Sequence, residues 1–402
     1  MYTKHGHLSY CTNIHAGENW TDHFDALTKY FPEIKQAVSP DEPMGIGLRL
    51  SNIASEELIK TANLEEFRNW LKDQKAYVFT MNGFPYGGFH HTRVKEQVHA
   101  PDWTTRERVT YTKRLFDILM NLLPEGMEGG VSTSPISYRY WFENDAAQQK
   151  ARETGTACIA EIALYLVQIA NFSGVVMHLD IEPEPDGILE TGTEFLEWFN
   201  NELLAVAVPL IQTEFDVPTH HAEEMVKTHI RICYDVCHFA VGYEPLTEMV
   251  EKFRENGIKI GKIQVSAALK AILPAHPDTR KSVIDAFRKF NEPVYLHQVV
   301  AKNNGHIKRY RDLPDALNDA QPATETEWRA HFHVPIAEKK FGDLESTQDA
   351  ITEVLELQKK SPFTHQLEVE TYTWEVIPGQ LRLPIEQSII KELNWAKSIL
   401  EN

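Results

Sequence analysis

Short apolar segments alternate with polar loops and amphipathic helical stretches along the whole chain. Ten segments have the alternating or continuously apolar pattern of strands, and they span residues 7–14, 45–51, 77–82, 130–134, 175–182, 230–237, 259–266, 294–300, 329–336 and 366–374. Longer segments between them repeat apolar residues with helical spacing, at 20–38, 64–75, 105–123, 146–172, 192–214, 244–256, 280–290 and 347–359. Regular alternation of strands and helices predicts a parallel sheet covered by helices.

Eight or more such units in one chain predict a closed (β/α)8 barrel, the TIM-barrel architecture of the α/β class. We expect one barrel domain over residues 1–402, because α/β barrels run to this length as single domains. Ten strands exceed the eight of a barrel, so we expect an insertion or extension at residues 267–328 within the late βα units. An open, doubly wound sheet is the alternative. It is disfavoured in its dinucleotide-binding form because no G-x-G-x-x-G follows the first strand.

Acidic and histidine residues, which are the types that bind metals, lie at the carboxyl ends of the later predicted strands. In a barrel the reacting groups are found at these ends. These residues are Glu182, Asp235, His238, His331, His333, Glu368 and Glu370. Buried carboxylates need a compensating charge, and carboxylates that converge with imidazoles suit a divalent cation such as Mn²⁺, Zn²⁺, Co²⁺ or Mg²⁺. Such an ion polarises a carbonyl, and a neighbouring carboxylate then moves a proton. The alternatives are a hydrogen-bonded structural His331 and a solvated Glu368.

The amino-acid composition limits the kinds of molecule that this protein is expected to bind. The formal net charge of −18 argues against a nucleic-acid partner, since phosphate binding needs a basic face. The most apolar long stretch, residues 157–172, is interrupted by polar residues, so no membrane insertion is expected. Four cysteines are too few for a disulfide framework. We therefore expect free thiols, a cytoplasmic location and a small-molecule partner, and the number of subunits stays open.

The pattern of strand-end residues resembles the sugar isomerase and epimerase barrels of the xylose-isomerase-like superfamily. The resemblance is carried by Glu182, by the sequence Asp235-x-x-His238, by a strand containing His333, and by Glu370 on the last strand. It implies that Glu182, Asp235, His333 and Glu370 bind the metal. It also implies that Glu182 and Glu370 shuttle protons and that His238 acts on the substrate side.

Longer stretches resemble the EboE family of metabolite traffic proteins over essentially the whole chain. They are residues 5–15 (HGHLSYCTNIH), 82–87 (NGFPYG), 94–96 (VKE), 101–103 (PDW), 331–335 (HFHVP) and 368–374 (EVETYTW). This resemblance implies a barrel protein that serves a bacterial gene cluster which makes or moves a small metabolite precursor. It does not define a reaction, because one barrel fold hosts many chemistries.

One departure from the isomerase pattern concerns Gln264, which stands where an isomerase has a metal-binding histidine. Either Gln264 replaces that ligand, or the role has moved to His331 or His333, with His297 as a further candidate. The expected substrate contacts are His15, Arg49, Asn82, Gln264, His297 and His331.

Three functional hypotheses follow. The first is a metal-dependent isomerase or epimerase-like enzyme that acts on a small polyhydroxylated or cyclic metabolite. The second is a protein that binds and hands on a biosynthetic intermediate without converting it. The third is a metal-dependent hydrolase, which uses the same ligands to activate water.

Overall fold

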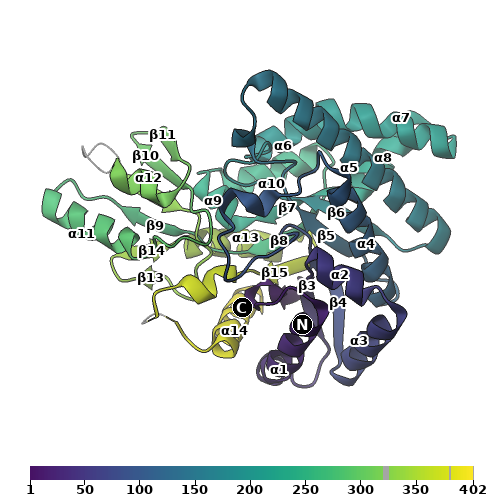
Figure 1. Ribbon diagram of the computed structural model, residues 1–402, viewed down its shortest axis with the longest axis horizontal. Helices are drawn as coiled ribbons and strands as arrows, with labels where there is room; N and C mark the ends of the chain where they lie inside the picture. Colours follow the sequence, from purple (N-terminus) through teal and green to yellow (C-terminus); the bar gives the residue numbers. More distant parts are fainter. Residues whose placement is uncertain (320–325, 380–381, 402) are drawn as a thin grey trace.

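The computed structural model describes residues 1–319, 326–379 and 382–401, and its main body is a ring of eight parallel strands (Figure 1). In ring order they are β2 (Gly6–Tyr10), β3 (Met44–Arg49), β4 (Ala76–Asn82), β5 (Gly129–Thr133), β6 (Met177–Ile181), β7 (Ile230–Asp235), β8 (Ile260–Val265) and β15 (Gln366–Val369). β15 pairs with both β8 and β2. A parallel bridge between Cys11 and Gly47 joins the β2 edge to β3. The predicted (β/α)8 barrel is therefore confirmed, and β15 is the strand that completes it.

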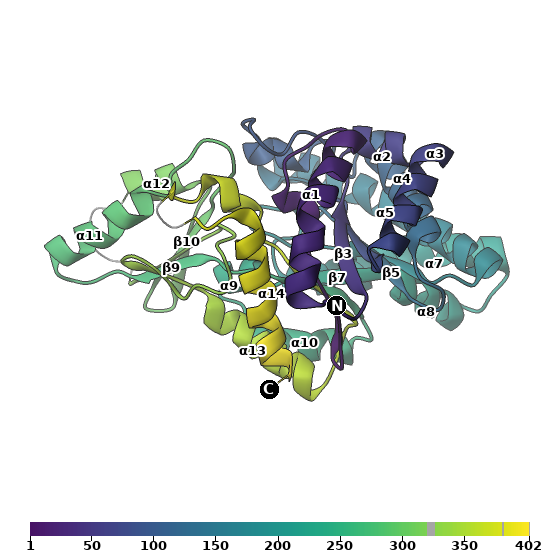
Figure 2. The ribbon, with the colours of Figure 1, turned by 90° about the horizontal axis from the view of Figure 1, so that it is seen from below.

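Helices surround the ring, one or more after each strand of the barrel. They are α1 (Trp20–Val38), α2 (Asn52–Leu58), α3 (Thr61–Asp73), α4 (Arg106–Leu122), α5 (Asp145–Ser173), α6 (Gly192–Trp198), α7 (Leu204–Phe215), α8 (Thr219–His229), α9 (Val236–Val241), α10 (Leu246–Glu255), α13 (Gln348–Lys360) and α14 (Ile385–Glu401). α1 has the predicted bounds because Asn19 caps its first turn and its apolar residues repeat at helical spacing. α1 and α14 lie side by side (Figure 2).

A second, antiparallel sheet projects from one side of the barrel (Figure 1). It contains β9 (Leu269–Ile272), β10 (Val299–Asn303), β11 (His306–Tyr310), β12 (Glu327–Ala330), β13 (Lys340–Phe341) and β14 (Leu344–Ser346), and it is accompanied by α11 (Pro277–Arg288) and α12 (Leu313–Asn318). The surplus strands expected in the late βα units lie here. The inserted sheet continues to Ser346, past the predicted limit of residue 328, and residues 320–325 lie outside the described residues.

Three barrel strands end earlier than the apolar pattern predicts. β2 gives way to a 3₁₀ turn at Thr12–Ile14, β7 to α9 at Val236, and β15 to a 3₁₀ turn at Tyr372–Val376. Cys237, which lies at the end of the strand predicted over residues 230–237, is therefore on α9, whereas Cys233 is on β7. All four cysteines are free and buried, as expected.

The barrel interior holds a column of polar side chains rather than a purely apolar core. Alternate residues of one strand face the same side of a sheet, so β6 and β15 each contribute a polar residue at successive levels, namely His178, Asp180 and Glu182, and Gln366, Glu368 and Glu370. Glycines on facing strands leave room for them. A Cβ atom at Gly261 would lie 1.8 Å from Oδ1 of Asp180, and one at Gly47 would lie 1.7 Å from Oε1 of Glu368.

α5 is long and apolar enough to cross a membrane by length and composition. Half of its most apolar 18-residue window is buried here, because the helix packs against β6, α4, α7 and α8. That packing is the ordinary environment of a core helix in a barrel.

Candidate metal centre and active site

The carboxyl end of β6 places Glu182 at the mouth of the barrel. Its backbone N–H donates a 3.0 Å hydrogen bond to the carbonyl of Thr133 on β5, which extends the strand pairing by one residue. The side chain is buried, and its Oε1 lies 3.8 Å from Nδ1 of His238. Among the described residues, Oε2 has no hydrogen-bond partner. Burial, followed by the negative charges of Glu370 and Asp235, raises the pKa of Glu182 well above its usual value.

Asp235 is both the last residue of β7 and the N-cap of α9. Its Oδ1 accepts hydrogen bonds from the backbone N–H of His238 at 2.9 Å and from the hydroxyl of Ser266 at 2.8 Å. The Asp-x-x-His spacing therefore has a local cause, because a capping carboxylate bonds the backbone N–H three residues later. In the described part of the chain, Oδ2 has no partner. Burial raises the pKa of Asp235 to about 7.

Glu370 follows β15, where its backbone N–H donates to the carbonyl of Val265. The side-chain amides of Asn13 and Asn82 both donate to Oε1 of Glu370, at 2.8 and 2.9 Å. Oε2 lies 3.3 Å from Nδ1 of His333. One amide from the turn after β2 and one from the end of β4 thus hold one oxygen of a carboxylate that follows the last strand.

His331 and His333 lie in an irregular segment that follows β12, and not on a strand as the sequence pattern predicts. The backbone N–H of His331 donates to the carbonyl of Gln298, and the carbonyl of His333 accepts from the hydroxyl of Thr373. The two rings still approach each other, with their Nε2 atoms 3.2 Å apart. The inserted antiparallel sheet therefore carries both histidines to the barrel mouth.

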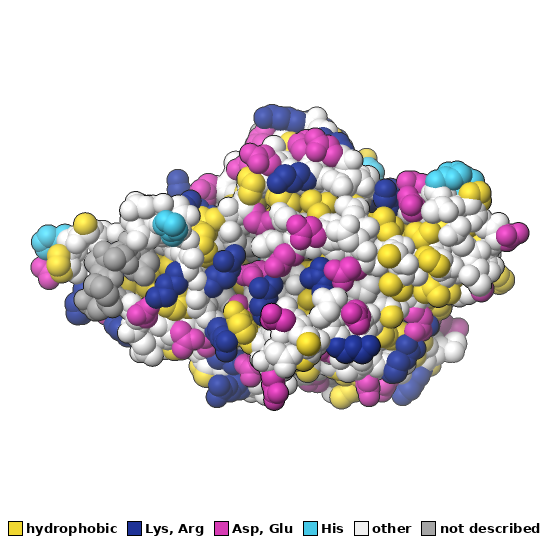
Figure 3. Space-filling model, turned by 90° about the horizontal axis from the view of Figure 1, so that it is seen from above, with side chains coloured by type: hydrophobic (Ala, Val, Ile, Leu, Met, Phe, Trp, Pro, Cys, Tyr) yellow, Lys and Arg dark blue, Asp and Glu magenta, His cyan; other side chains and the backbone are white. Residues whose placement is uncertain are grey.

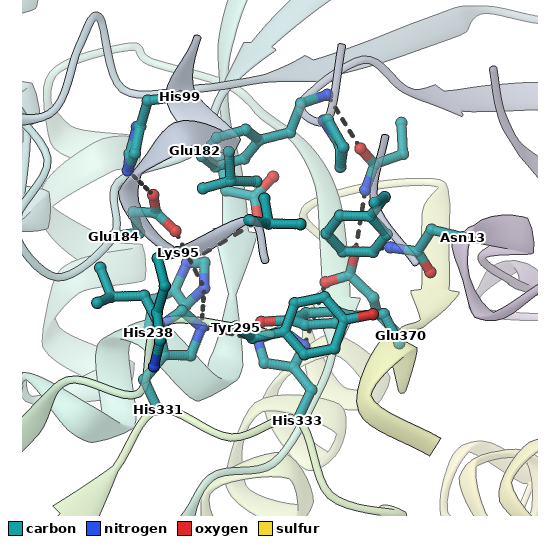
Figure 4. Close-up of a pocket in the computed structure, with 18 of the residues that line it drawn as sticks. Asn13, Lys95, His99, Glu182, Glu184, His238, Tyr295, His331, His333 and Glu370 are labelled. Atoms are coloured by element: carbon teal, nitrogen blue, oxygen red, sulfur yellow. Dashed lines mark hydrogen bonds and ion pairs between the residues drawn. The ribbon is translucent and has the colours of Figure 1, made fainter. Parts of the chain in front are cut away.

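Glu182, Glu370, His331 and His333 line one cavity (Figure 4), and Asp235 lies next to it, within reach of Glu182 and Glu370. Glu182, Asp235 and Glu370 each offer one oxygen, and the three oxygens lie within 4.8 Å of one another. Ligand atoms of Asp235, His238 and His333 form a second group of the same size. The four residues predicted to bind a metal are thus brought together.

The donor set fits a divalent cation. Oxygen atoms of carboxylates together with imidazole nitrogens suit Mn²⁺, Zn²⁺, Co²⁺ and Mg²⁺. Oε2 of Glu182 and Oδ2 of Asp235 are both buried without a hydrogen-bond partner in the described ranges, and such atoms are costly unless a cation compensates them. Lys262, which lies inside the barrel, is already paired with Glu368.

Gln264 lies on β8 in register with Asp235 and Glu368. Its amide is fully buried and makes no hydrogen bond to the residues that the structure describes. Gln264 does not line the cavity, whereas His331 and His333 do. The geometry therefore brings His333, and not Gln264, to Glu370.

Two expected substrate contacts lie away from the cavity. The His15 ring stacks on Tyr30, with 5.0 Å between the ring centroids. Burial lowers the pKa of His15 to about 3. The Arg49 guanidinium donates to the carbonyls of Pro85 and Gly87, so it orders the loop after β4.

His297 supports the site from behind. Its Nε2 lies 2.6 Å from Oε1 of Glu292, and its Nδ1 lies 2.8 Å from the carbonyl of His331. Asn82, His238 and His331, which the sequence also singles out, do line the cavity.

Sequence reasoning missed Asn13 and Glu184, which both line the cavity. Glu184 continues the alternation of β6 past Pro183, which was a usable signal. Oε1 of Glu184 lies 2.8 Å from Nε2 of His99. Asn13 lies in the 3₁₀ turn after β2, where no strand periodicity marks it.

The cavity has a volume of about 60 Å³, room for roughly two water molecules. Its outer wall is largely apolar and is made by Phe84, Pro85, Phe89, Val94, Val98, Tyr295, Leu296 and Tyr372. Apolar walls with a few convergent polar groups are typical of small-molecule sites.

No protein-family model matches this chain, and no curated protein matches it either. Solved structures with a similar backbone include the IolI protein with a bound zinc atom. It is 13% identical, the alignment covers 98% of each chain, and the TM-score is 0.47. A xylose isomerase-like TIM-barrel protein from Mycobacterium smegmatis in complex with magnesium is 11% identical over 100% of this chain and 98% of that one, with a TM-score of 0.49.

A probable 3-DHS dehydratase, AsbF, from Bacillus anthracis is 14% identical over 68% of this chain and 78% of that one, with a TM-score of 0.34. None of these similarities supports the EboE family in particular. At this level of similarity they carry no argument about chemistry. The chain is a (β/α)8 barrel by its own strand order and closure, and it is similar to barrels of the xylose-isomerase-like kind.

Proposed function

We propose that this protein is a metal-dependent, isomerase- or epimerase-like enzyme that acts on a small polyhydroxylated or cyclic metabolite. The observation that carries the proposal is that ligand oxygens of Glu182, Asp235 and Glu370 lie within 4.8 Å of one another, beside a cavity that Glu182 and Glu370 line. These three carboxylates and His333 would hold one divalent ion, either Mn²⁺, Zn²⁺, Co²⁺ or Mg²⁺.

The proposed reaction class follows from the two carboxylates, Glu182 and Glu370, that could transfer protons beside the metal position. When bound, the ion polarises a carbonyl or a pair of adjacent oxygens on the substrate. Glu182, whose Oε2 makes no other hydrogen bond among described residues, takes a proton from the carbon next to that carbonyl. Glu370, held at Oε1 by Asn13 and Asn82, returns a proton to the neighbouring carbon or to the opposite face of the same carbon. In epimerisation one C–H bond breaks and one forms at the same carbon. In isomerisation the new C–H bond forms at the neighbouring carbon, and the proton of the adjacent hydroxyl also passes to the former carbonyl oxygen, so both reactions are redox-neutral overall.

The remaining polar residues of the cavity would contact the substrate. His238 lines the cavity from α9, and His331 lines it from the segment after β12. The apolar wall excludes water around the reacting carbon, which strengthens electrostatic interactions within the site.

The cellular role rests on the sequence resemblance. The stretches that resemble the EboE family would place the protein in a bacterial pathway that makes or moves a metabolite precursor in the cytoplasm. The net charge of −18 supports a small-molecule partner over a nucleic acid. On the face shown in Figure 3, acidic and basic side chains are interspersed and do not form a single basic patch.

The first test is the metal content of the purified protein by elemental analysis, with Glu182→Gln and Glu370→Gln beside the wild type. We expect the wild type to retain metal and both variants to lose the ion held at the carboxylates. Glu197→Gln makes the same chemical change on an exposed helix surface and is expected to behave as the wild type. A wild type that binds no divalent ion after incubation with each of the four metals would overturn the proposal.

The second test is a screen of aldoses, ketoses and cyclic polyol ketones in D₂O, read by NMR and mass spectrometry. An isomerase or epimerase incorporates deuterium at carbon. A hydrolase incorporates ¹⁸O from labelled water into its product without such exchange. A carrier binds its ligand and does neither.

A further inference from the structure

Three imidazole rings beside the carboxylates turn the same ring nitrogen toward one another. Nε2 of His238 lies 3.1 Å from Nε2 of His331, which in turn lies 3.2 Å from Nε2 of His333. All three side chains are buried. Figure 4 shows them on one side of the cavity, below Glu184.

The outer nitrogen of each ring faces an oxygen. Nδ1 of His238 lies 3.0 Å from the carbonyl of Pro183, and Nδ1 of His331 lies 2.8 Å from Oε1 of Gln298. The amide of Gln298 is oriented by its Nε2, which donates to the carbonyl of Pro185. Nδ1 of His333 lies 3.3 Å from Oε2 of Glu370.

These contacts determine the tautomers. Backbone carbonyl and side-chain amide oxygens only accept hydrogen bonds, so Nδ1 of His238 and Nδ1 of His331 carry the hydrogen. Nε2 of each of these two rings, when neutral, then presents a lone pair. This is how histidines that bind metals are normally held, with the far nitrogen donating to an oxygen and the near nitrogen free to ligate.

The two lone pairs of His238 and His331, which lie 3.1 Å apart, repel each other unless a positive charge lies near them. A hydrogen bond across this N···N contact would need one extra proton, and therefore a positively charged ring in a buried space. A divalent cation removes the repulsion at once. A carboxylate could serve as a third ligand for this cation, because Oε2 of Glu184 lies 4.0 Å from Nε2 of His238.

We propose that Glu184, His238 and His331 form a second metal position, adjacent to the one held by Glu182, Asp235 and Glu370. The ligand atoms of Glu184, His238 and His331 lie within 4.8 Å of one another, and this set shares no residue with the carboxylate set. The inference deepens the proposed function and rests on it, since the two ions would serve one cavity.

The two positions differ in chemistry. The carboxylate position is rich in oxygen, which suits Mg²⁺ or Mn²⁺, whereas the second position offers two imidazoles and one carboxylate, which suits Zn²⁺ or Co²⁺. Cys237 also lies beside His331 and His333, which adds a sulfur donor of the kind that zinc and cobalt accept. Two ions at one cavity favour a substrate with two neighbouring oxygens, such as a hydroxy ketone.

The test is a Co²⁺ titration of metal-free protein, read by visible absorption and by elemental analysis of the saturated protein. We expect two ions per chain in the wild type, and one per chain in Glu184→Gln and in His331→Asn. Glu182→Gln and Glu370→Gln should lose the other ion and keep the histidine-ligated one. His306→Asn, an exposed histidine on β11, is the matched control and should bind two. Circular dichroism checks that each variant is folded.

Gln298→Met provides a milder variant that keeps every ligand. It removes the acceptor for Nδ1 of His331, and loss of such an outer partner typically weakens metal binding about 10- to 100-fold. We expect that loss at one of the two Co²⁺ positions only.

Saturation of the wild type at one ion per chain, lost in Glu182→Gln, would overturn the second position and leave the proposed function standing. Two ions retained in both Glu184→Gln and His331→Asn would also overturn it. Binding of no ion at all would overturn both proposals together.

Discussion

The ammonium group of Lys262 lies 2.5 Å from Oε2 of Glu368 in the middle of the barrel, and both side chains are completely buried. Lys262 is on β8 and Glu368 on the neighbouring β15, one level below Glu370. The pair keeps the barrel lysine from neutralising the carboxylates at the mouth. Because both charges are buried, removal of either one is expected to lower the stability of the barrel.

We expect Lys262→Met and Glu368→Gln each to lower the free energy of unfolding by about 3–5 kcal/mol, because either change leaves a buried charge uncompensated. The double variant should be less destabilised than the sum of the two. Urea denaturation followed by circular dichroism measures all three. Lys281→Met breaks an exposed pair with Asp285 and should cost less than about 1 kcal/mol. Strict additivity of the two buried changes would show that the residues act independently.

Gly47 is required because the Glu368 carboxylate occupies the space of a side chain. A Cβ at this position would lie 1.7 Å from Oε1 of Glu368 and 2.9 Å from the backbone carbonyl of Tyr10. We expect Gly47→Ala to lower the free energy of unfolding by about 3 kcal/mol or more, at or beyond the upper end of overpacking effects. A Cβ at Gly87 would meet nothing within 4 Å, so Gly87→Ala is the control. Equal stability of the two variants in urea denaturation would contradict the close approach.

Glu392 on α14 predicts a pH dependence of stability. Burial raises its pKa from 4.5 to about 7, although the hydroxyls of Thr371 and Ser388 donate to it. An acid whose pKa is raised on folding holds its proton longer in the folded state. Its stabilising contribution is therefore complete below pH 4.5 and is lost as the pH rises to about 7.

Across that window the free energy of unfolding of the wild type should fall by about 3 kcal/mol more than that of Glu392→Gln. Urea denaturation at half-unit pH steps from 4.5 to 8 measures the difference. Glu401→Gln, an exposed change on the same helix, should track the wild type. A wild-type curve parallel to that of Glu392→Gln would contradict the raised pKa.

Asn82 positions Glu370 as a metal ligand, by donating from Nδ2 to Oε1 at 2.9 Å. Asn82→Leu should weaken binding of the proposed ion at the carboxylates about 10- to 100-fold, because outer hydrogen bonds orient a ligating carboxylate. Competition with a chromogenic chelator gives the dissociation constant. Asn121→Leu, at an exposed site on α4, should leave it unchanged. If Asn82→Leu leaves the dissociation constant of the metal unchanged, the hydrogen bond from Asn13 is sufficient to orient Glu370.

Much of the architecture was predictable from the sequence, because local patterns carry it. Strand and helix periods depend on residues near one another in the chain, and α1 was predicted with the bounds that it has. The alternation on β6 and β15 also identified Glu182 and Glu370 as residues on one face of their strands. The Asp-x-x-His spacing of Asp235 and His238 was visible because a helix cap is itself a local structure.

The rest depended on contacts between distant parts of the chain. Alternation tells which side of a strand a residue faces but not its depth in the barrel. It therefore cannot separate His178 from Glu182, of which only Glu182 reaches the cavity. Turns have no periodicity, and for that reason Asn13 was missed and His15 was expected in the site. Arg49 does end a barrel strand, but its guanidinium is bound by the carbonyls of Pro85 and Gly87, a contact between distant residues that the sequence pattern does not show.

The choice between Gln264 and His333 as the partner of Glu370 shows which features are local and which depend on the tertiary structure. The sequence by itself determined the barrel, the chemistry of the donors and the strand ends that carry them, because hydrophobic period and residue type are local properties. Only the tertiary structure decided that an inserted antiparallel sheet brings His331 and His333 to Glu370 while Gln264 stays away from the cavity. The position of an insertion relative to a barrel is determined by packing between residues far apart in the chain, and no local pattern records it.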